Sequence, residues 1–288
     1  MLSTFAGLSS KPRLSFRHRP FLPMLSFLAL TGTLLGASGP HGTVDLVAER
    51  TSVQAGQTIW VGLHFQLEKD WHIYWINPGD SGEPPRVQWS LPTGFQAGPL
   101  EWPVPRRIPD HSLVDYGYQD EVLLPAEIKT PVHLAAGNQV ALSARVNWLV
   151  CRETCIPARA DLSLTLPVGK GTPSSAQPLF TKTRDRLPKP APKAWRVAAK
   201  LDGRLFTLNV ETGNPEREAV FFPLEASQLE NASPQKVDSS SRGFRLELQK
   251  SDQMLKPPAH LAGVLVLAAG QGYFIKAPVV SVNSQRSH

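Results

Sequence analysis

The chain contains two cysteines, Cys151 and Cys155, which lie between two segments in which apolar and polar residues alternate. Alternation with a period of two is typical of a β-strand that buries one face. Proline cannot donate to a central ladder, so Pro157 is expected in the connection. The two strands are therefore predicted to be joined by a short loop with a cysteine near each root. Such a geometry can close a disulfide and can also open one. The alternating apolar residues are Val140, Leu142, Ala144, Val146, Trp148 and Val150 before the pair, and Leu162, Leu164 and Leu166 after it.

The spacing of the cysteines leaves three interpretations open: thiol-disulfide exchange, a structural staple, and metal binding. Closing a loop this short stabilises a fold by only about 2 kcal/mol in the chain-entropy model, and a domain of ordinary size does not depend on that. A short ring can also carry strain, and strained or exposed disulfides are reduced more easily. Two thiolates need further soft or imidazole ligands to hold a metal, and the sequence has no nearby histidine or methionine cluster. No hydrolase or phosphate-binding motif appears.

Composition favours an all-β fold and argues against a nucleic-acid partner. The 288 residues include 27 prolines and 21 glycines, with few helical patterns, as expected for short strands and turns. The net charge is +6, but residues 1–38 hold Lys11, Arg13, Arg17 and Arg19 without any acid, so most of the excess lies there. The remainder has no basic cluster strong enough to indicate a polyanion-binding surface.

Residues 1–38 are predicted to be a signal peptide. Basic residues precede an apolar run over residues 24–35, and the small residues Gly36, Ala37 and Ser38 follow where a signal peptidase can cut. The run is shorter than the roughly 20 residues of a membrane span, although an uncleaved anchor is the alternative. We therefore expect a periplasmic or secreted protein without a membrane span after signal removal, in a compartment that permits disulfides.

An aromatic strand over residues 71–76 runs into a turn rich in glycine and proline. Its Trp71, His72 and Tyr74 are interpreted either as core packing or, together with Trp148, as the rim of a partner-binding site. His72 lies between aromatic residues, where a hydrogen-bonded core residue is more common than a ligand or base. No metal ligands are assigned.

The segment Asp115-Tyr116-Gly117-Tyr118 precedes a predicted strand over residues 122–129. Two tyrosines around a glycine are consistent with a turn whose rings complete the core. Alternatively, the segment is a loop that lies over the cysteines and shields them.

The chain is predicted to form two β-sandwiches in tandem. The first domain covers residues 39–167, and residues 168–194 form a proline-rich linker in which Leu179, Thr183 and Leu187 have the spacing of a short helix. The second sandwich covers residues 195–288. It contains no cysteine and no tight cluster of acids and histidines, so no chemistry of its own is expected there.

Four stretches of the chain together carry a family resemblance. They are Trp71-His72-x-Tyr74-Trp75-x-Asn77-Pro78-Gly79-Asp80-Ser81-Gly82-x-Pro84, Glu101-Trp102-Pro103-x-Pro105-x-Arg107, Tyr116-Gly117-Tyr118-x-x-Glu121-Val122-Leu123-Leu124-Pro125 and Trp148-Leu149-Val150-Cys151-x-x-x-Cys155-Ile156-Pro157. In this order they resemble the N-terminal periplasmic domain of the DsbD/ScsB thiol:disulfide interchange proteins. The resemblance covers residues 43–167, and residues 195–282 are similar, with weaker motifs, to the additional β-domain of the ScsB-like branch. It implies an immunoglobulin-like fold.

The resemblance also implies a chemistry and a role for each cysteine. Cys155 would form the mixed disulfide with a partner and Cys151 would resolve it, while residues 115–118 would match the cap loop of the family. We therefore expect a protein-disulfide reductase-like exchange that needs no cofactor. The partners would be periplasmic thioredoxin-like proteins and a separate membrane electron donor, and the pathway cytochrome c maturation or disulfide isomerisation. The alternative is a non-enzymatic protein-binding module with a structural disulfide.

Overall fold

The computed structural model describes residues 1–2 and 37–282, so the predicted signal segment lies almost entirely outside the described residues. The predicted cleavage point after Ser38 falls within β1 (Ala37–Gly39), which pairs with β2 (Gly42–Ala48). In the part of the chain that the structure describes, no helix is both long and apolar enough to cross a membrane. Of the residues that the structure describes, 58% lie in strands and 4% in a helix, which confirms the all-β prediction.

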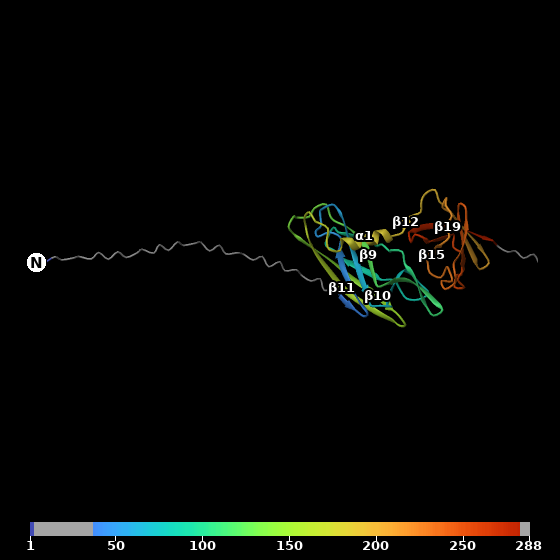
Figure 1. Ribbon diagram of the computed structural model, residues 1–288, viewed down its shortest axis with the longest axis horizontal. Helices are drawn as coiled ribbons and strands as arrows, with labels where there is room; N and C mark the ends of the chain where they lie inside the picture. The colour runs from blue at the N-terminus through green and yellow to red at the C-terminus, as the bar shows by residue number, and fades with distance from the viewer. Residues whose placement is uncertain (3–36, 283–288) are drawn as a thin grey trace, which may run out of the picture. The chain divides into compact units, whose positions relative to one another are not determined.

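The first sandwich consists of two facing sheets (Figure 1). The sheet order is β1-β2-β3-β9-β6 in one and β11-β10-β4-β8-β7 in the other, with β5 also paired to β10. Alternating apolar residues of both sheets, such as Phe65 and Val146, share one core. Besides β1 and β2, the strands are β3 (Thr58–Leu67), β4 (His72–Gly79), β5 (Arg86–Ser90), β6 (Gln96–Leu100), β7 (Arg106–Asp110), β8 (Leu113–Gln119), β9 (Glu121–Lys129), β10 (Gln139–Cys151) and β11 (Cys155–Pro167).

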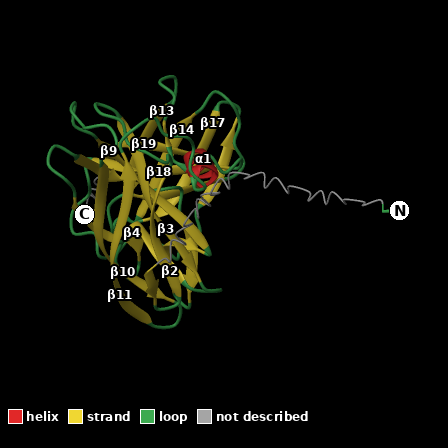
Figure 2. Cartoon of the chain, turned by 90° about the vertical axis from the view of Figure 1, so that its left-hand side faces the viewer, coloured by secondary structure: helices red, strands yellow, loops and turns green. Residues whose placement is uncertain are grey.

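The cysteine hairpin is formed by β10 and β11, which pair along their whole length and lie side by side in Figure 2. The prediction of two strands with a cysteine at each root is confirmed, because Cys151 and Cys155 are the last residues paired before the turn. The expectation for Pro157 is wrong. It lies inside β11 opposite Leu149, and a proline is tolerated there because β11 is an edge strand.

The second sandwich, drawn in orange to red in Figure 1, has a single path of strands, β15-β18-β19-β13-β14-β17-β16, with β12 paired to β19. Side chains from both halves of this path, such as Phe206 and Phe221, share a second apolar core. The strands are β12 (Lys189–Pro190), β13 (Arg196–Asp202), β14 (Leu205–Glu211), β15 (Ala219–Pro223), β16 (Lys236–Ser240), β17 (Gly243–Gln249), β18 (His260–Leu267) and β19 (Gly272–Val282).

The connection between the sandwiches contains α1 (Gln177–Arg186), with a proline in its first turn and Phe180 buried. A proline suits this position because its missing N–H would have no partner there in any case. The Arg184 guanidinium makes two hydrogen bonds of 2.7 and 2.6 Å with the Glu49 carboxylate. The helix is thereby attached to the first sandwich.

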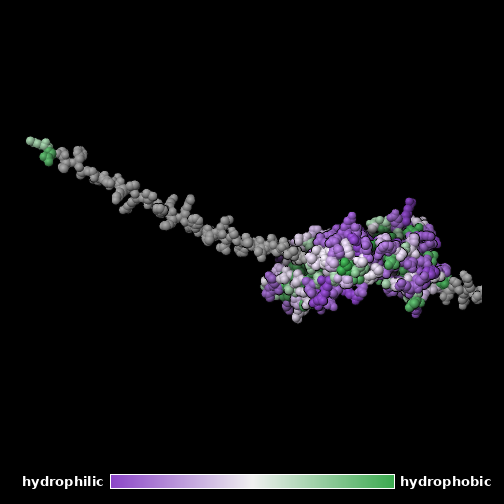
Figure 3. All heavy atoms as spheres, turned by 90° about the horizontal axis from the view of Figure 1, so that it is seen from below, coloured by the Kyte–Doolittle hydropathy of each residue, from purple (hydrophilic) through white to green (hydrophobic). Residues whose placement is uncertain are grey.

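The two sandwiches pack directly against each other. Phe222 of β15 belongs to the core cluster of the first sandwich, where its ring meets those of Trp75 and Tyr116 edge-on at 6.1 and 5.0 Å between centroids. The Asn77 amide donates a 2.8 Å hydrogen bond to the Pro223 carbonyl. On the face seen in Figure 3, hydrophilic side chains predominate and apolar ones appear in small groups. The packing of Phe222 against Trp75 and Tyr116 thus buries aromatic surface that a separate first sandwich would expose.

Candidate functional site

Cys151 and Cys155 form a disulfide that closes the end of the β10–β11 hairpin, with 4.2 Å between their Cα atoms. The two residues differ in accessibility. Cys151 is 2% exposed, because it also pairs with His72 on β4, whereas Cys155 is exposed. A nucleophile from another protein can therefore reach the bond from the side of Cys155.

Tyr74, which is fully buried on β4, places its hydroxyl 3.3 Å from Cys155 Sγ and 3.4 Å from Ser81 Oγ. A disulfide sulfur carries no hydrogen, so Tyr74 must be the donor to Cys155. The Ser81 hydroxyl donates to Asp115 Oδ2 at 2.9 Å, so Tyr74 must also be the donor to Ser81. One phenolic proton is thus shared between Ser81 and Cys155. Burial raises the pKa of Tyr74 to about 12, which keeps this donor protonated at neutral pH.

Asp115, which lies on β8, fixes the position of Ser81, the residue that shares the Tyr74 proton with Cys155. Its buried carboxylate accepts a 3.0 Å hydrogen bond from the Ser81 backbone N–H in addition to the bond from the Ser81 hydroxyl. His72 Nε2 lies 3.5 Å from Asp115 Oδ2 without a hydrogen bond between them. A buried carboxylate is stable only when its oxygens have donors, so the Ser81 turn and Asp115 hold each other in place.

Two glycines make this packing possible. Gly82 has φ +73°, and a Cβ atom at this position would lie 2.1 Å from Cζ of Tyr74, so only glycine leaves room for the ring. Gly117 brings β8 so close to β4 that a Cβ would lie 2.2 Å from the Ile73 carbonyl oxygen. The sequence thus places glycine where the aromatic ring and the two strands approach each other most closely.

The hairpin tip is covered on one side by Trp71. Its ring stacks on His41 with 3.6 Å between centroids, and the Arg152 guanidinium lies 5.3 Å from the same ring. Arg152 is the first residue after Cys151 in the turn. The contact places a positive charge beside the disulfide, and such charges favour a thiolate.

Comparison with known proteins agrees with this geometry. Residues 43–167, which include the disulfide, Tyr74 and Asp115, match the family model described as Thiol:disulfide interchange protein DsbD, N-terminal. The first sandwich is a DsbD N-terminal domain. No curated protein sequence matches the chain.

Both sandwiches together resemble a solved structure, the N-terminal periplasmic domain of ScsB from Proteus mirabilis. The TM-score is 0.60 at 17% identity, and the match covers 83% of this chain and 94% of that one. At this identity the match shows a shared fold. BcpA, the major pilin subunit of Bacillus cereus, and the periplasmic chaperone SfaE match with TM-scores of 0.28 and 0.22 at 8% and 9% identity. They cover 85% and 82% of this chain, and 69% and 100% of their own.

Asp115, Tyr116, Gly117 and Tyr118 of the DsbD N-terminal domain form the centre of β8 and are not a loop. Pairing with β4 on one side and β7 on the other satisfies their backbone groups, which is why the segment extends the sheet. The Tyr118 hydroxyl donates to the Pro103 carbonyl at 2.7 Å. Asp115 is linked to the disulfide through Ser81 and Tyr74. Whether these residues shield the cysteines stays a prediction.

The predicted rim residues of the DsbD N-terminal domain, Trp71, His72, Tyr74 and Trp148, are all buried. Trp71 lies at the hairpin tip, while Trp148 packs edge-on against Phe65 in the core, with 5.6 Å between ring centroids. Their role in binding a partner stays a prediction.

Sequence reasoning missed Asp80 and Ser81 as site residues, and it missed Asn231 of the second sandwich. Asp80 and Ser81 belong to a stretch that carried the family resemblance, which was the available signal. Asn231 donates to Asp80 at 2.8 Å across 151 residues of sequence, and no local pattern marks it.

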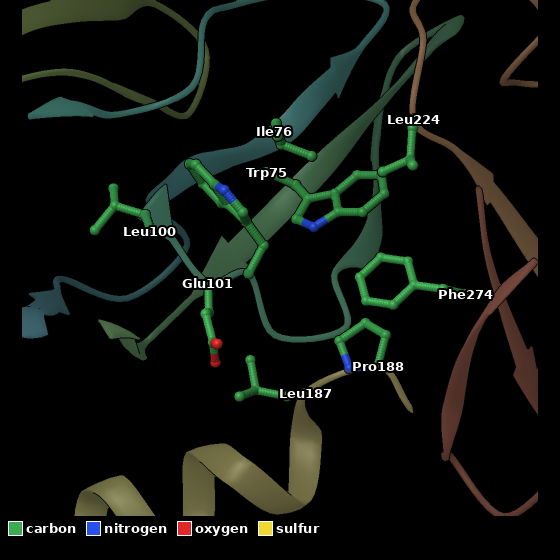
Figure 4. Close-up of a pocket in the computed structure, with 9 residues that line it drawn as sticks. Trp75, Ile76, Leu100, Glu101, Leu187, Pro188, Leu224 and Phe274 are labelled. Atoms are coloured by element: carbon green, nitrogen blue, oxygen red, sulfur yellow. The ribbon is translucent and has the colours of Figure 1, made fainter. Parts of the chain in front are cut away.

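A separate cavity of about 430 Å³ lies between the DsbD N-terminal domain and the second sandwich (Figure 4). Trp75 lines it, although the preceding residue, Tyr74, contacts the disulfide. Glu101 alone is charged among the described residues that line it, and burial and the charge of Glu127 raise its pKa. The other lining residues are Ile76, Leu100, Trp102, Leu187, Pro188, Leu224 and Phe274.

Proposed function

We propose that the chain exchanges dithiol for disulfide with other proteins through Cys151 and Cys155. The observation that carries the proposal is an exposed Cys155 bonded to a buried Cys151, with the protonated Tyr74 hydroxyl 3.3 Å from the exposed sulfur. A structural staple does not need a hydrogen-bond donor aimed at one of its sulfurs. The name of the matching family supports the same chemistry.

The exchange transfers two electrons without a cofactor. A thiolate of the partner attacks Cys155 Sγ, the bond to Cys151 breaks, and Cys151 leaves as a thiolate that takes a proton from solvent. A second partner thiolate then attacks the partner's sulfur in the mixed disulfide and releases Cys155 as a thiolate. The partner dithiol has become a disulfide and the pair is reduced. In the reverse sequence, Cys155 attacks the disulfide of another protein and Cys151 resolves the intermediate.

Tyr74 favours the steps in which Cys155 carries negative charge. In the disulfide, its proton is shared between Ser81 Oγ and a weak sulfur acceptor. A thiolate is a stronger acceptor, so the same proton would bond to Cys155 once the disulfide opens. This hydrogen bond would lower the pKa of the Cys155 thiol and make Cys155 both a better leaving group and a more available nucleophile.

The surface of the hairpin offers room for a partner chain. Against the hairpin lies a hollow of about 310 Å³, lined by Pro84, Trp148, Leu149 and Pro157 among others, which would accommodate side chains of a partner. We infer that thioredoxin-like proteins dock here and that a separate membrane protein supplies electrons. Cytochrome c maturation or disulfide isomerisation would be the pathway.

Location and domain organisation are part of the same proposal. Residues 1–38 would direct the chain to the periplasm or outside the cell, residues 39–167 would carry the exchange, residues 168–194 would connect, and residues 195–288 would form the second domain.

The test is the reduction potential of the pair, measured by equilibration in thiol buffers and counting alkylated cysteines by mass. A potential near or above about −250 mV is expected for an exchanging pair, and one below about −300 mV would mark a structural bond. Cys151→Ser should trap a mixed disulfide with a thioredoxin-like protein, whereas Cys155→Ser should trap none. A potential in the structural range with no trapped partner would refute the proposal.

A further inference from the structure

Asn231 connects the second sandwich to the disulfide site. It lies in the segment between β15 and β16, yet its side chain is buried and its hydrogen bonds are with residues of the first sandwich. Its Nδ2 donates to Asp80 Oδ1 at 2.8 Å, and its Oδ1 accepts from the Tyr116 hydroxyl at 2.8 Å. The Arg107 guanidinium donates to its backbone carbonyl. One asparagine thus joins three elements of the neighbouring sandwich, the turn after β4 and the strands β7 and β8, by three hydrogen bonds.

Asp80 is the residue before Ser81, in the turn that follows β4. Its second oxygen, Oδ2, accepts a 2.7 Å hydrogen bond from the Val114 backbone N–H. Asn231 on one side and Val114 on the other therefore fix the Asp80 carboxylate. The next residue, Ser81, contacts Asp115 and the Tyr74 hydroxyl, and that hydroxyl contacts Cys155 Sγ. The chain of contacts from Asn231 to Cys155 is continuous.

We propose that Asn231 is a positioning residue for the disulfide. By holding Asp80, the second sandwich sets the position of the Ser81 turn and, through Ser81, the orientation of the Tyr74 hydroxyl toward Cys155. This inference rests on the proposed exchange function and deepens it, because it gives the second sandwich a part in the reactivity of a cysteine that it does not touch.

The hydrogen-bond chemistry of Asn231 is suited to this task. An amide side chain donates from nitrogen and accepts at oxygen, so it can bridge the Asp80 carboxylate and the Tyr116 hydroxyl at the same time. The hydrogen bond to Asp80 involves a charged acceptor, which makes it the stronger of the two. Without this donor the exposed Asp80 carboxylate is free to turn to solvent, and the Ser81 turn loses its support from that side.

The Asn231→Asp variant removes the contact with Asp80 and keeps the contact with Tyr116. The new carboxylate still accepts from Tyr116, but it faces Asp80 Oδ1 with like charge, so the Asp80 contact is lost. The charged or titratable groups that contact position 231 are Asp80, Arg107 and Tyr116, and Asp115 lies beyond them, bonded to Ser81. The readout is the rate at which Cys155 of the reduced protein is alkylated as a function of pH, with the modified residue identified by mass. We expect the apparent pKa of the Cys155 thiol to rise and alkylation at pH 7 to slow by about three- to ten-fold.

The double variant Asp80→Asn/Asn231→Asp exchanges the two groups and provides the decisive rescue. The amide at position 80 can accept from Val114 and donate to the carboxylate at position 231, which still accepts from Tyr116. The rate and pH profile of Cys155 should then return toward the wild type. The matched control is Asn214→Asp, which adds the same charge at an exposed position of the second sandwich and should leave the profile unchanged.

The outcomes separate this inference from the proposed function. If the wild-type chain exchanges thiols but folded Asn231→Asp has the wild-type profile, the positioning role is refuted and the function stands. If the double variant folds without restoring the profile, the route through Asp80 is refuted. If Asn231→Asp does not fold, the rescue of both folding and profile by the double variant decides. A wild-type chain that does not exchange thiols would refute the proposed function itself.

Discussion

Both sandwiches consist of β-strands, but they differ in where their buried polar residues lie. In the first sandwich His72, Asn77 and Asp115 are buried within strands, next to the disulfide or the domain contact. In the second sandwich the buried polar residues, Gln228, Asn231 and Ser251, lie between strands. Polar residues inside strands cost stability unless each has a partner. Buried polar residues within strands therefore mark the first sandwich as the one whose geometry has to be fixed around the disulfide.

The largest expected effect on stability comes from replacing a glycine with positive φ, and we expect it to differ between the two sandwiches. Gly82→Ala forces a methyl group into the Tyr74 ring, so we expect a loss of about 4 kcal/mol from overpacking and left-handed strain together. Gly203→Ala, in the second sandwich, has φ +57° and nothing within 4 Å of the added atom, so about 1 kcal/mol is expected. Urea unfolding of both variants measures the difference.

The same pair distinguishes packing from chemistry. The Gly82→Ala variant should also exchange thiols more slowly at temperatures where it is folded, because Tyr74 is displaced from Cys155. Equal losses of stability in the two variants would contradict the close packing of Tyr74 on the Ser81 turn.

The next effect concerns buried and exposed carboxylates. Asp115→Ala leaves the Ser81 backbone N–H without its partner, and we expect it to lower the free energy of unfolding by about 2 kcal/mol. Asp238, in the second sandwich, is exposed and lies 3.6 Å from Arg245, so Asp238→Ala should cost no more than about 0.5 kcal/mol. Thermal unfolding at pH 7 compares them. A loss for Asp115→Ala as small as that for Asp238→Ala would show that the Ser81 turn does not depend on this carboxylate.

A smaller change in stability, but a clear change in reactivity, is expected for Tyr74→Phe. The ring stays in place, so the free energy of unfolding should fall by about 1 kcal/mol, the usual value of one hydrogen bond. Exchange with a thioredoxin-like protein should slow by roughly ten-fold, because the Cys155 thiolate loses its donor. Tyr273→Phe in the second sandwich is the control and should leave the rate unchanged. A normal rate in Tyr74→Phe would remove the tyrosine from the mechanism.

The sequence predicts the cysteine hairpin well, because alternation over residues 140–150 and 162–166 determines which face of each strand is buried. It does not predict β8 as a strand, because the close approach of Gly117 to Ile73 depends on a partner strand more than 40 residues away. The short strands β6, β7 and β16 also carry too few alternating residues to be recognised.

Some features of the candidate site can likewise be predicted from the sequence, and others cannot. The cysteines and the aromatic stretch around Tyr74 are visible locally, since rare residue types and the family motifs mark them. The orientation of Tyr74 toward Cys155, and the contact of Asn231 with Asp80, arise only when distant strands are packed together. A contact across 151 residues leaves no periodic signal in either segment.

The smallest effect is expected on the pH dependence of stability. Replacing Glu101, at the domain contact, and replacing Glu121, on β9, should change the stability in opposite directions. Burial, and then the charge of Glu127, raise the pKa of Glu101. The folded state therefore holds this proton more tightly than the unfolded state. The stability that it contributes is present below the unfolded pKa and is lost as pH rises through the folded pKa. Glu101→Gln should thus gain stability relative to wild type as pH rises through and above 4.5.

For Glu121, burial alone would raise the pKa, but hydrogen bonds from His64 and Lys182 lower it below its usual value. Its contribution is present above the unfolded pKa and is lost as pH falls through the folded pKa. Glu121→Gln should therefore be less stable than wild type at pH 7, and the difference should vanish on acidification below 4.5. Urea unfolding between pH 3 and pH 7 measures both curves. Differences of the same sign would mean that the carboxylate at the domain contact is as well paired as the one on β9, and the cavity between the sandwiches would then be more polar than its lining indicates.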